Sequence, residues 1–147
     1  MKLELTLRIV LEKPPPAVDF GLQLGKGKDY QTIQKQRSKG NDLSFDCQVT
    51  VQNNRADGLP NFLGPLAQGP VTGRFVYIDV GQYAGQTDTC WSRRIKIPLS
   101  GLDWELIKQA SRESGAVLEA RLAGTGRDGG PVCGTVRPTP GWKLFKS

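Results

Sequence analysis

Apolar and polar side chains alternate one by one along the first twelve residues, and this alternation constrains the fold more than any other feature. Polar residues separate the apolar ones, which are Leu3, Leu5, Leu7, Ile9 and Leu11. A period of two places successive side chains on opposite faces of a strand, so residues 2–12 are predicted to form a strand with one buried face. The run Pro14–Pro16 ends this strand, because proline donates no hydrogen bond to a ladder.

Similar short segments recur along the chain and predict further strands. They cover residues 18–24, 30–35, 43–51, 74–80, 94–99, 116–122, 132–136 and 142–145. Both faces of 74–80 are apolar, which is typical of a central strand. Residues 53–73 carry turn dipeptides instead and are predicted as a loop, with either a functional role or a role as a lid over the sheet.

One segment changes from the period of a strand to the period of a helix. Ser100 and Asp103 form an S-x-x-D capping signal, after which apolar residues recur at intervals of four: Leu102, Leu106 and Ala110. Gly115 is placed to end the helix. The spacing predicts one short α-helix near residues 101–113.

Short strands separated by turns, with a single helix, indicate an all-β fold. The chain has 18 glycines and 10 prolines, which supply those turns. Too few helices are predicted for a β-α-β architecture. We therefore expect one domain, residues 1–147, folded as an antiparallel β-sandwich or barrel.

The chain contains no histidine, which excludes the commonest kinds of catalytic and metal centre. Ser-His-Asp and Cys-His catalysis and His-ligated metals all need imidazole. The three cysteines, Cys47, Cys90 and Cys133, have no C-x-x-C spacing, so neither a disulfide framework nor a zinc ribbon is predicted. No catalytic residue, metal or cofactor is assigned. Cys47 lies on an apolar strand face and is expected to be buried and inert, and Cys90 to be more accessible.

The net charge of +6 favours an anionic partner, with simple solubility as the alternative. A basic cluster, formed by Lys26, Lys28, Lys35, Arg37 and Lys39, fits a phosphate-binding face or, preferably, a solvated sheet edge. Since no nucleic-acid-binding signature is present, only non-specific association with nucleic acid is predicted. The apolar runs are too short to span a membrane and the N-terminus does not resemble a signal peptide, so a cytoplasmic protein is expected. A homo-oligomer is left open.

A glycine-rich segment near the C-terminus matches G-x-G-x-x-G. It contains Gly124, Gly126 and Arg127. A dinucleotide site needs a helix directly after this motif, whereas Pro131 and a predicted strand follow here. The favoured interpretation is a hairpin loop, and the minority interpretation is an anion cradle of backbone N–H groups.

Aromatic and charged residues near strand ends form a second candidate ligand site. They are Tyr77, Asp79, Tyr83, Trp91 and Arg93. Arg93 shares parity with Ile95 and Ile97, so it is predicted to point toward the core and to pair with a carboxylate, preferably Asp79, or with a bound anion. Arg94 is predicted to be solvated. A carboxylate pair such as Asp79 with Glu105 could in principle carry out general acid–base catalysis.

Several stretches of the sequence together resemble one protein family. They are residues 5–20 (LTLRIVLEKPPPAVDF), 21–23, 36–38, 61–65, 73–79 (GRFVYID), 90–99 (CWSRRIKIPL), 104–107 and 124–131 (GTGRDGGP). This set resembles a family of small bacterial proteins known only as a domain of unknown function. The resemblance implies a free-standing bacterial domain and carries over no functional residue.

The sequence favours a non-catalytic binding module for an anionic or carbohydrate-like small ligand. The candidate ligand-binding residues are Tyr77, Asp79, Tyr83, Trp91, Arg93, Gly124, Gly126 and Arg127. The alternative is a histidine-free enzyme that uses Asp or Glu as acid and base. The ligand, the strand order and any protein partner are left open.

Overall fold

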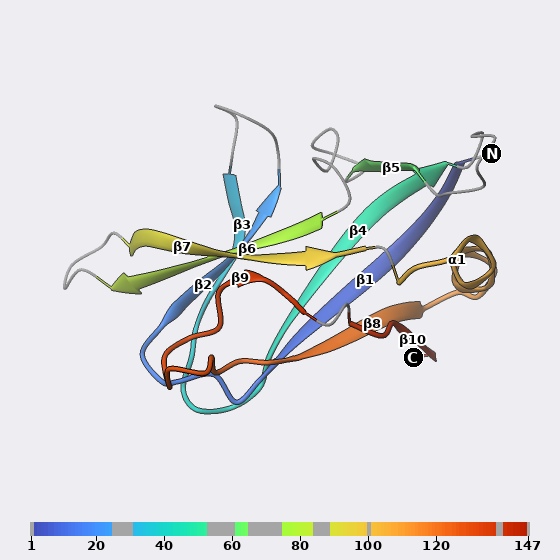
Figure 1. Ribbon diagram of the computed structural model, residues 1–147. Coiled ribbons are helices and arrows are strands. Elements are labelled where there is room, and N and C mark those ends of the chain that lie inside the picture. Colours follow the sequence, from blue (N-terminus) through green and yellow to red (C-terminus); the bar gives the residue numbers. More distant parts are fainter. Residues whose placement is uncertain are drawn as a thin grey trace.

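The alternating segments form the strands of two sheets that face each other through their apolar sides (Figure 1). The computed structural model describes residues 2–24, 31–52, 61–64, 75–83, 89–99, 101–137 and 140–146. Both sheets are open, so the architecture is a sandwich rather than a barrel. Among the described residues, no helix has the length and apolarity that a membrane span requires.

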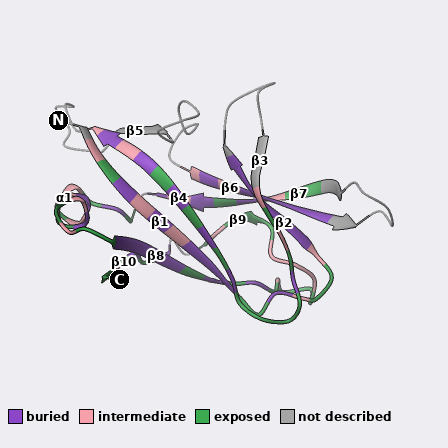
Figure 2. Cartoon of the chain, turned by 180° about the vertical axis from the view of Figure 1, so that it is seen from behind, coloured by how far each residue is buried: buried purple, intermediate pink, exposed green. Residues whose placement is uncertain are grey.

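Sheet A has the strand order β10-β8-β1-β4-β5. Its strands are β1 (Lys2–Glu12), β4 (Leu43–Gln52), β5 (Asn61–Gly64), β8 (Ala116–Ala123) and β10 (Lys143–Lys146). The longest ladder is antiparallel and joins β1 to β4, from Lys2 opposite Gln52 to Leu11 opposite Leu43. Every second residue of these two strands faces the core, as Figure 2 shows by the alternation of buried and exposed positions. The predictions for residues 2–12 and 43–51 are confirmed.

Sheet B has the strand order β3-β2-β6-β7-β9. Its strands are β2 (Asp19–Leu24), β3 (Gln31–Arg37), β6 (Phe75–Tyr83), β7 (Thr89–Pro98) and β9 (Gly134–Thr135). Residues 75–80 of the apolar segment belong to β6, which has a strand on each side and is central as predicted. β3 is an edge strand, which agrees with the edge interpretation of Lys35. Arg37 instead pairs with the buried Asp19 at 2.8 Å, and Lys26 and Lys28 lie outside the described residues.

The predicted all-β sandwich with one short helix is confirmed, but two of its strand pairings are parallel and not antiparallel. β1 pairs with β8 in parallel, and β7 pairs with β9 in parallel. Parallel neighbours need a long connection, and most of the chain separates β1 from β8. Period-two alternation reports which face a residue occupies but not the direction of the neighbouring strand.

The core lies between the sheets. Its wholly buried side chains come from both of them and include Leu7, Ile9, Phe45, Phe20, Ile78, Ile95 and Ile97.

Helix α1 (Trp104–Arg112) packs on β1 and β8 through Ile107 and Ala110. Asp103 itself is the N-cap, and its carboxylate accepts a hydrogen bond from Leu106 N at 2.7 Å. The helix therefore begins after Asp103, three residues later than the capping signal predicted, and ends at Arg112.

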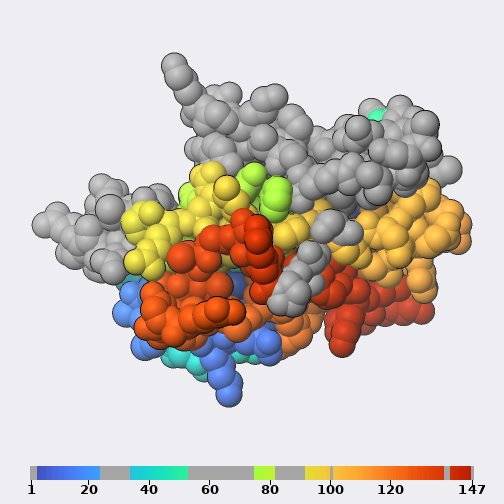
Figure 3. Space-filling view, viewed as in Figure 1, coloured from blue at the N-terminus to red at the C-terminus, as the bar shows by residue number. Residues whose placement is uncertain are grey.

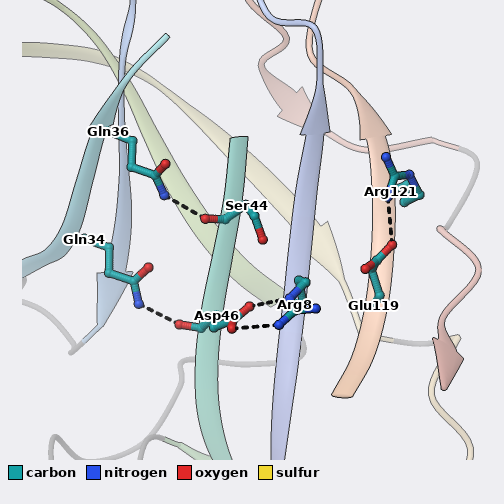
Figure 4. Close-up of polar contacts among 7 residues, drawn as sticks. All are labelled: Arg8, Gln34, Gln36, Ser44, Asp46, Glu119 and Arg121. Carbon is teal, nitrogen blue, oxygen red and sulfur yellow. Dashed lines mark hydrogen bonds and ion pairs between the residues drawn. The ribbon is translucent and has the colours of Figure 1, made fainter. Parts of the chain in front are cut away.

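Two glutamine side chains connect the sheets at one corner (Figure 4). Gln34 of β3 donates to the carbonyl of Asp46 at 2.6 Å, and Gln36 donates to the carbonyl of Ser44 at 2.7 Å. In this part of β4 the described ladder with β5 has already ended, because β5 reaches only Thr50. The amides therefore satisfy carbonyl groups along an open strand edge, where unpaired backbone groups favour association.

The C-terminal segment crosses from one sheet to the other and back. After β8 the chain forms a hairpin loop, adds β9 beside β7, and returns as β10 beside β8. Val136 N donates to Lys96 O at 2.9 Å and extends the short contact with β7. In Figure 1 this segment, coloured orange to red, passes over one side of the sandwich.

Candidate anion-binding sites

A cleft of about 570 Å³ lies where the C-terminal segment leaves β8 and returns toward it. Apolar residues from both arms line it, among them Leu122, Val132 and Val136. Its polar lining comes from Arg121, Arg127, Cys133, Thr135 and Arg137. Ligand pockets in proteins commonly have volumes of about 300–1,000 Å³, with a largely apolar lining and a few convergent polar groups. This cleft has the same character.

The hairpin loop that shapes the cleft is fixed by close backbone packing at Gly124. Gly124 N donates to Glu12 O at 2.8 Å, and Val132 N donates to Gly124 O at 3.0 Å. A Cβ atom at position 124 would lie 2.7 Å from Pro14 N and 2.8 Å from Glu12 O. Only glycine allows this approach, so Gly124 has a structural role and does not line the cleft.

The backbone of the glycine-rich loop is largely committed to its own hydrogen bonds. Gly126 N donates to Gly130 O at 2.7 Å, and Gly129 N donates to Gly126 O at 3.1 Å. Gly130 N donates to the Asp128 carboxylate at 3.0 Å. The segment is therefore a hairpin loop, as favoured from the sequence. These three N–H groups already donate within the loop and so do not form the anion cradle that the sequence offered as the minority interpretation. Gly126 does not line the cleft.

Two arginines supply the uncompensated positive charge of the cleft. Arg127 and Arg137 are both exposed, and neither forms an ion pair with a carboxylate in the described part of the chain. The described lining of the cleft contains no Asp or Glu. An anion entering the cleft would therefore meet two guanidinium groups and no opposing carboxylate, an arrangement that suits phosphate and carboxylate ligands.

Arg121 also lines the cleft, but it already has three carboxylate partners. Its guanidinium lies 3.0 Å from Glu119, 3.3 Å from Asp42 and 3.5 Å from Glu12. The hydrogen bond to Glu119 is the main cause that raises the pKa of Arg121 above its usual value. Arg121 therefore holds the wall of the cleft in place.

The same network continues across the outer face of sheet A (Figure 4). Arg8 donates two hydrogen bonds to the Asp46 carboxylate, at 2.8 and 3.1 Å. This contact raises the pKa of Arg8. The two arginines of this face, Arg8 and Arg121, are thus paired with carboxylates.

A smaller hollow, of about 330 Å³, lies on β6 and β7. Its described lining consists of Asp79, Ser92, Arg93 and Arg94. A β-bulge shapes it, because Val80 pairs with Arg93 whereas Gly81 pairs with Trp91, which leaves Ser92 as the extra residue. Bulges bend a strand and redirect its side chains.

The predicted pairing of Arg93 is wrong, although its preferred carboxylate is involved. Arg93 is exposed, and Arg94 instead donates from Nε to Asp79 Oδ1 at 2.7 Å. The guanidinium carbon of Arg94 also lies 5.1 Å from the centre of the Tyr77 ring. Arg93 shares a face with core residues, but it lies next to the bulge, where the sheet no longer encloses its side chain.

The remaining residues of the predicted strand-end site are only partly brought together. Tyr77 and Asp79 share the outer face of β6, but the side chains of Tyr83, Trp91 and Cys90 lie outside the described residues. Glu105 is exposed on helix α1, which packs on sheet A, and pairs with Lys108 at 2.8 Å. Asp79 and Glu105 are therefore on different parts of the fold, and the proposed carboxylate pair is not formed.

Arg137 and Cys133 were not among the sequence candidates. Both follow the glycine loop, and no local pattern distinguishes them from other surface residues. Cys133 is an exposed free thiol in the cleft, whereas Cys47 is buried as predicted, and burial raises the pKa of Cys47 to about 11.

In the described part of the chain, no cluster of three or more acidic or cysteine side chains could hold a metal ion.

Comparison with protein families gives a match that covers almost the whole chain. Residues 5–145 match the model of a family of unknown function, DUF5990. No curated protein and no solved structure matches the chain. The chain therefore belongs to the family of unknown function DUF5990.

Proposed function

We propose that the chain binds a small anionic ligand with an apolar part in the cleft between β8 and β9. The observation that carries the proposal is that Arg127 and Arg137 face one cleft whose described lining holds no carboxylate. The ligand is expected to have an apolar part because Leu122, Val132 and Val136 line the cleft with apolar surface, which an inorganic ion would leave uncovered. The binding is non-catalytic, with no acid–base pair assigned.

An anionic ligand has more support than a neutral sugar. Sugar sites stack the ring of the ligand on an open aromatic face, and Arg94 already lies over the Tyr77 ring. No aromatic side chain is part of the described cleft lining.

The free thiols of Cys47 and Cys133 are consistent with a reducing, cytoplasmic setting, and a bacterial origin is implied by the family resemblance.

The test is ligand-induced thermal stabilisation with three probes: phenyl phosphate, inorganic phosphate and methyl glucoside. Phenyl phosphate should stabilise the protein most, because it combines negative charge with an apolar ring. By mass action the gain reaches about 2.7 kcal/mol at a hundredfold excess over the dissociation constant. Arg127→Ala and Arg137→Ala should each reduce the gain. Arg112→Ala, on helix α1, removes the same charge elsewhere and should not.

The cleft also contains its own reporter. Phenyl phosphate should slow alkylation of Cys133 and leave Cys47 unaffected, because Cys47 is buried in the core. Equal stabilisation by methyl glucoside, or full stabilisation in a variant that lacks both Arg127 and Arg137, would refute the proposal.

A further inference from the structure

The positive charge of the cleft continues along β7. Lys96 of β7 pairs with Thr135 of β9, and Thr135 lines the cleft. The wall of the cleft is therefore joined directly to the strand that carries Arg93 and Arg94. In Figure 3 the β7 residues, in yellow, and the C-terminal segment, in orange to red, are neighbours on one face of the molecule. We call the cations of this region the basic strip, which consists of Arg93, Arg94, Lys96, Arg127 and Arg137. Arg93 differs in parity from Arg94 and Lys96 but belongs to the strip because, beside the bulge, it lines the same hollow as Arg94.

The strip holds a surplus of positive charge that its own carboxylates do not cancel. Among the described residues, the strip has Asp79, which pairs with Arg94, and Asp128, which accepts from Gly130 N within the hairpin loop. On sheet A, by contrast, Arg8 and Arg121 are paired with the carboxylates of their own face. The chain carries a net charge of +6, and in the described part of the chain Arg93, Lys96, Arg127 and Arg137 form no ion pair. The positive field of such a surface favours an extended anion.

The middle of the strip presents a flat, fixed cation. Asp79 holds Arg94 through Nε, and the guanidinium lies over the Tyr77 ring. Unpaired bases stack on arginine planes as well as on aromatic rings, and adjacent cations then contact the phosphates. Arg94 and Lys96 are two residues apart on one face of β7, about 7 Å along the strand. Single-stranded nucleic acid combines both features that this surface would recognise.

From this arrangement we propose that the basic strip binds the backbone of single-stranded nucleic acid, without sequence specificity. The strip shares Arg127 and Arg137 with the cleft, so the proposal rests on the anion-binding function in that part. Arg93, Arg94 and Lys96 extend the contact beyond anything a small ligand could reach. The occupant is a linear polyanion that lies across β7 and β9, with one phosphate in the mouth of the cleft.

The test is fluorescence anisotropy of labelled oligothymidylate over a range of salt concentrations. Each phosphate contact on a single strand contributes about −0.7 to the slope of log K against log salt. Arg94 is paired with Asp79 and stacks on a base, so the other four cations of the strip predict a slope of about −2.8. Arg93→Ala and Lys96→Ala should each make the slope shallower by about 0.7. Arg112→Ala removes one positive charge from helix α1 and should leave the slope unchanged. Circular dichroism of each variant checks that the fold is intact.

The outcomes separate this proposal from that of the small-ligand cleft. The double variant Arg93→Ala/Lys96→Ala should lose oligothymidylate affinity and keep its stabilisation by phenyl phosphate. If the double variant binds oligothymidylate as the unchanged protein does, or if Arg112→Ala alters the slope equally, the strip is not the binding surface. Undetectable oligothymidylate binding at about 50 mM salt also overturns the proposal. A different result would refute only the small-ligand function: phenyl phosphate does not stabilise the protein, but oligothymidylate binding shows the expected salt dependence and the expected losses in the Arg93 and Lys96 variants.

Discussion

Removing Arg94 should destabilise the fold, whereas removing its neighbour Arg93 should not. Arg94→Ala leaves the Asp79 carboxylate, whose side chain is 11% exposed, without the partner that lies 2.7 Å away. Breaking a buried ion pair costs about 3–5 kcal/mol. Because the Arg94 side chain is 37% exposed, solvent screens the pair and a cost of about 2 kcal/mol is expected. Loss of the contact with the Tyr77 ring adds about 0.5 kcal/mol.

Equilibrium unfolding in urea measures this difference. Arg93→Ala is the matched control, since it removes the same side chain from the adjacent position of β7, and its unfolding free energy should change by less than about 0.5 kcal/mol. Asp79→Asn in the Arg94→Ala background should recover part of the loss, because it removes the unpaired charge. A larger loss for Arg93→Ala than for Arg94→Ala would refute the reasoning and would restore the inward orientation that parity alone predicts for Arg93.

Four further predictions concern a close backbone contact, the helix N-cap and the two described thiols. Gly124→Ala should destabilise the fold by about 3 kcal/mol or more, because the added Cβ atom would meet the backbone of residues 12–14. Thermal unfolding measures this loss, and a value below about 1 kcal/mol would contradict the prediction. Asp103→Ala should cost about 1 kcal/mol by removing the helix N-cap, measured as urea-unfolding free energy, and an unchanged value would contradict the cap assignment. In native thiol labelling followed by peptide mapping, Cys133 should react well before Cys47. Because burial raises the pKa of Cys47 to about 11, its contribution to stability is fully present below about pH 9 and declines by about 1.4 kcal/mol per pH unit toward pH 11; Cys47→Ala should show a shallower decline over that range.

Much of the fold could be predicted, because the period with which buried residues recur depends only on neighbouring residues in the chain. The parity of Leu5, Leu7 and Ile9 predicts the core face of β1, and the same argument correctly places Cys47 in the core of β4. The switch to helical spacing identifies α1, whose start moves by three residues because Asp103, not Ser100, caps it. Local patterns succeed where the local backbone is regular.

The candidate sites were less predictable, because irregular backbone and distant segments form them. Arg93 keeps the parity of the core residues but is exposed beside the bulge at Ser92, and the regular register of β6 and β7 places Arg94, not Arg93, opposite Asp79. The cleft needs the end of β8 and the segment after β9 to lie side by side, and that follows from a two-residue pairing of β9 with β7. Arg127 was identified through its motif, whereas Arg137 has no local signal.

The sequence by itself determined which faces are apolar, where strands end, that the fold is mostly β, and that imidazole chemistry is excluded. These properties depend on side-chain type and spacing over a few residues, and the physics of burial acts on them directly. Only the tertiary structure decided that β8 lies parallel to β1, that the sheets stay open, and that Arg127 and Arg137 share a cleft. The reason is that strand direction and partner choice are settled by contacts between residues far apart in the chain, and no local period encodes them.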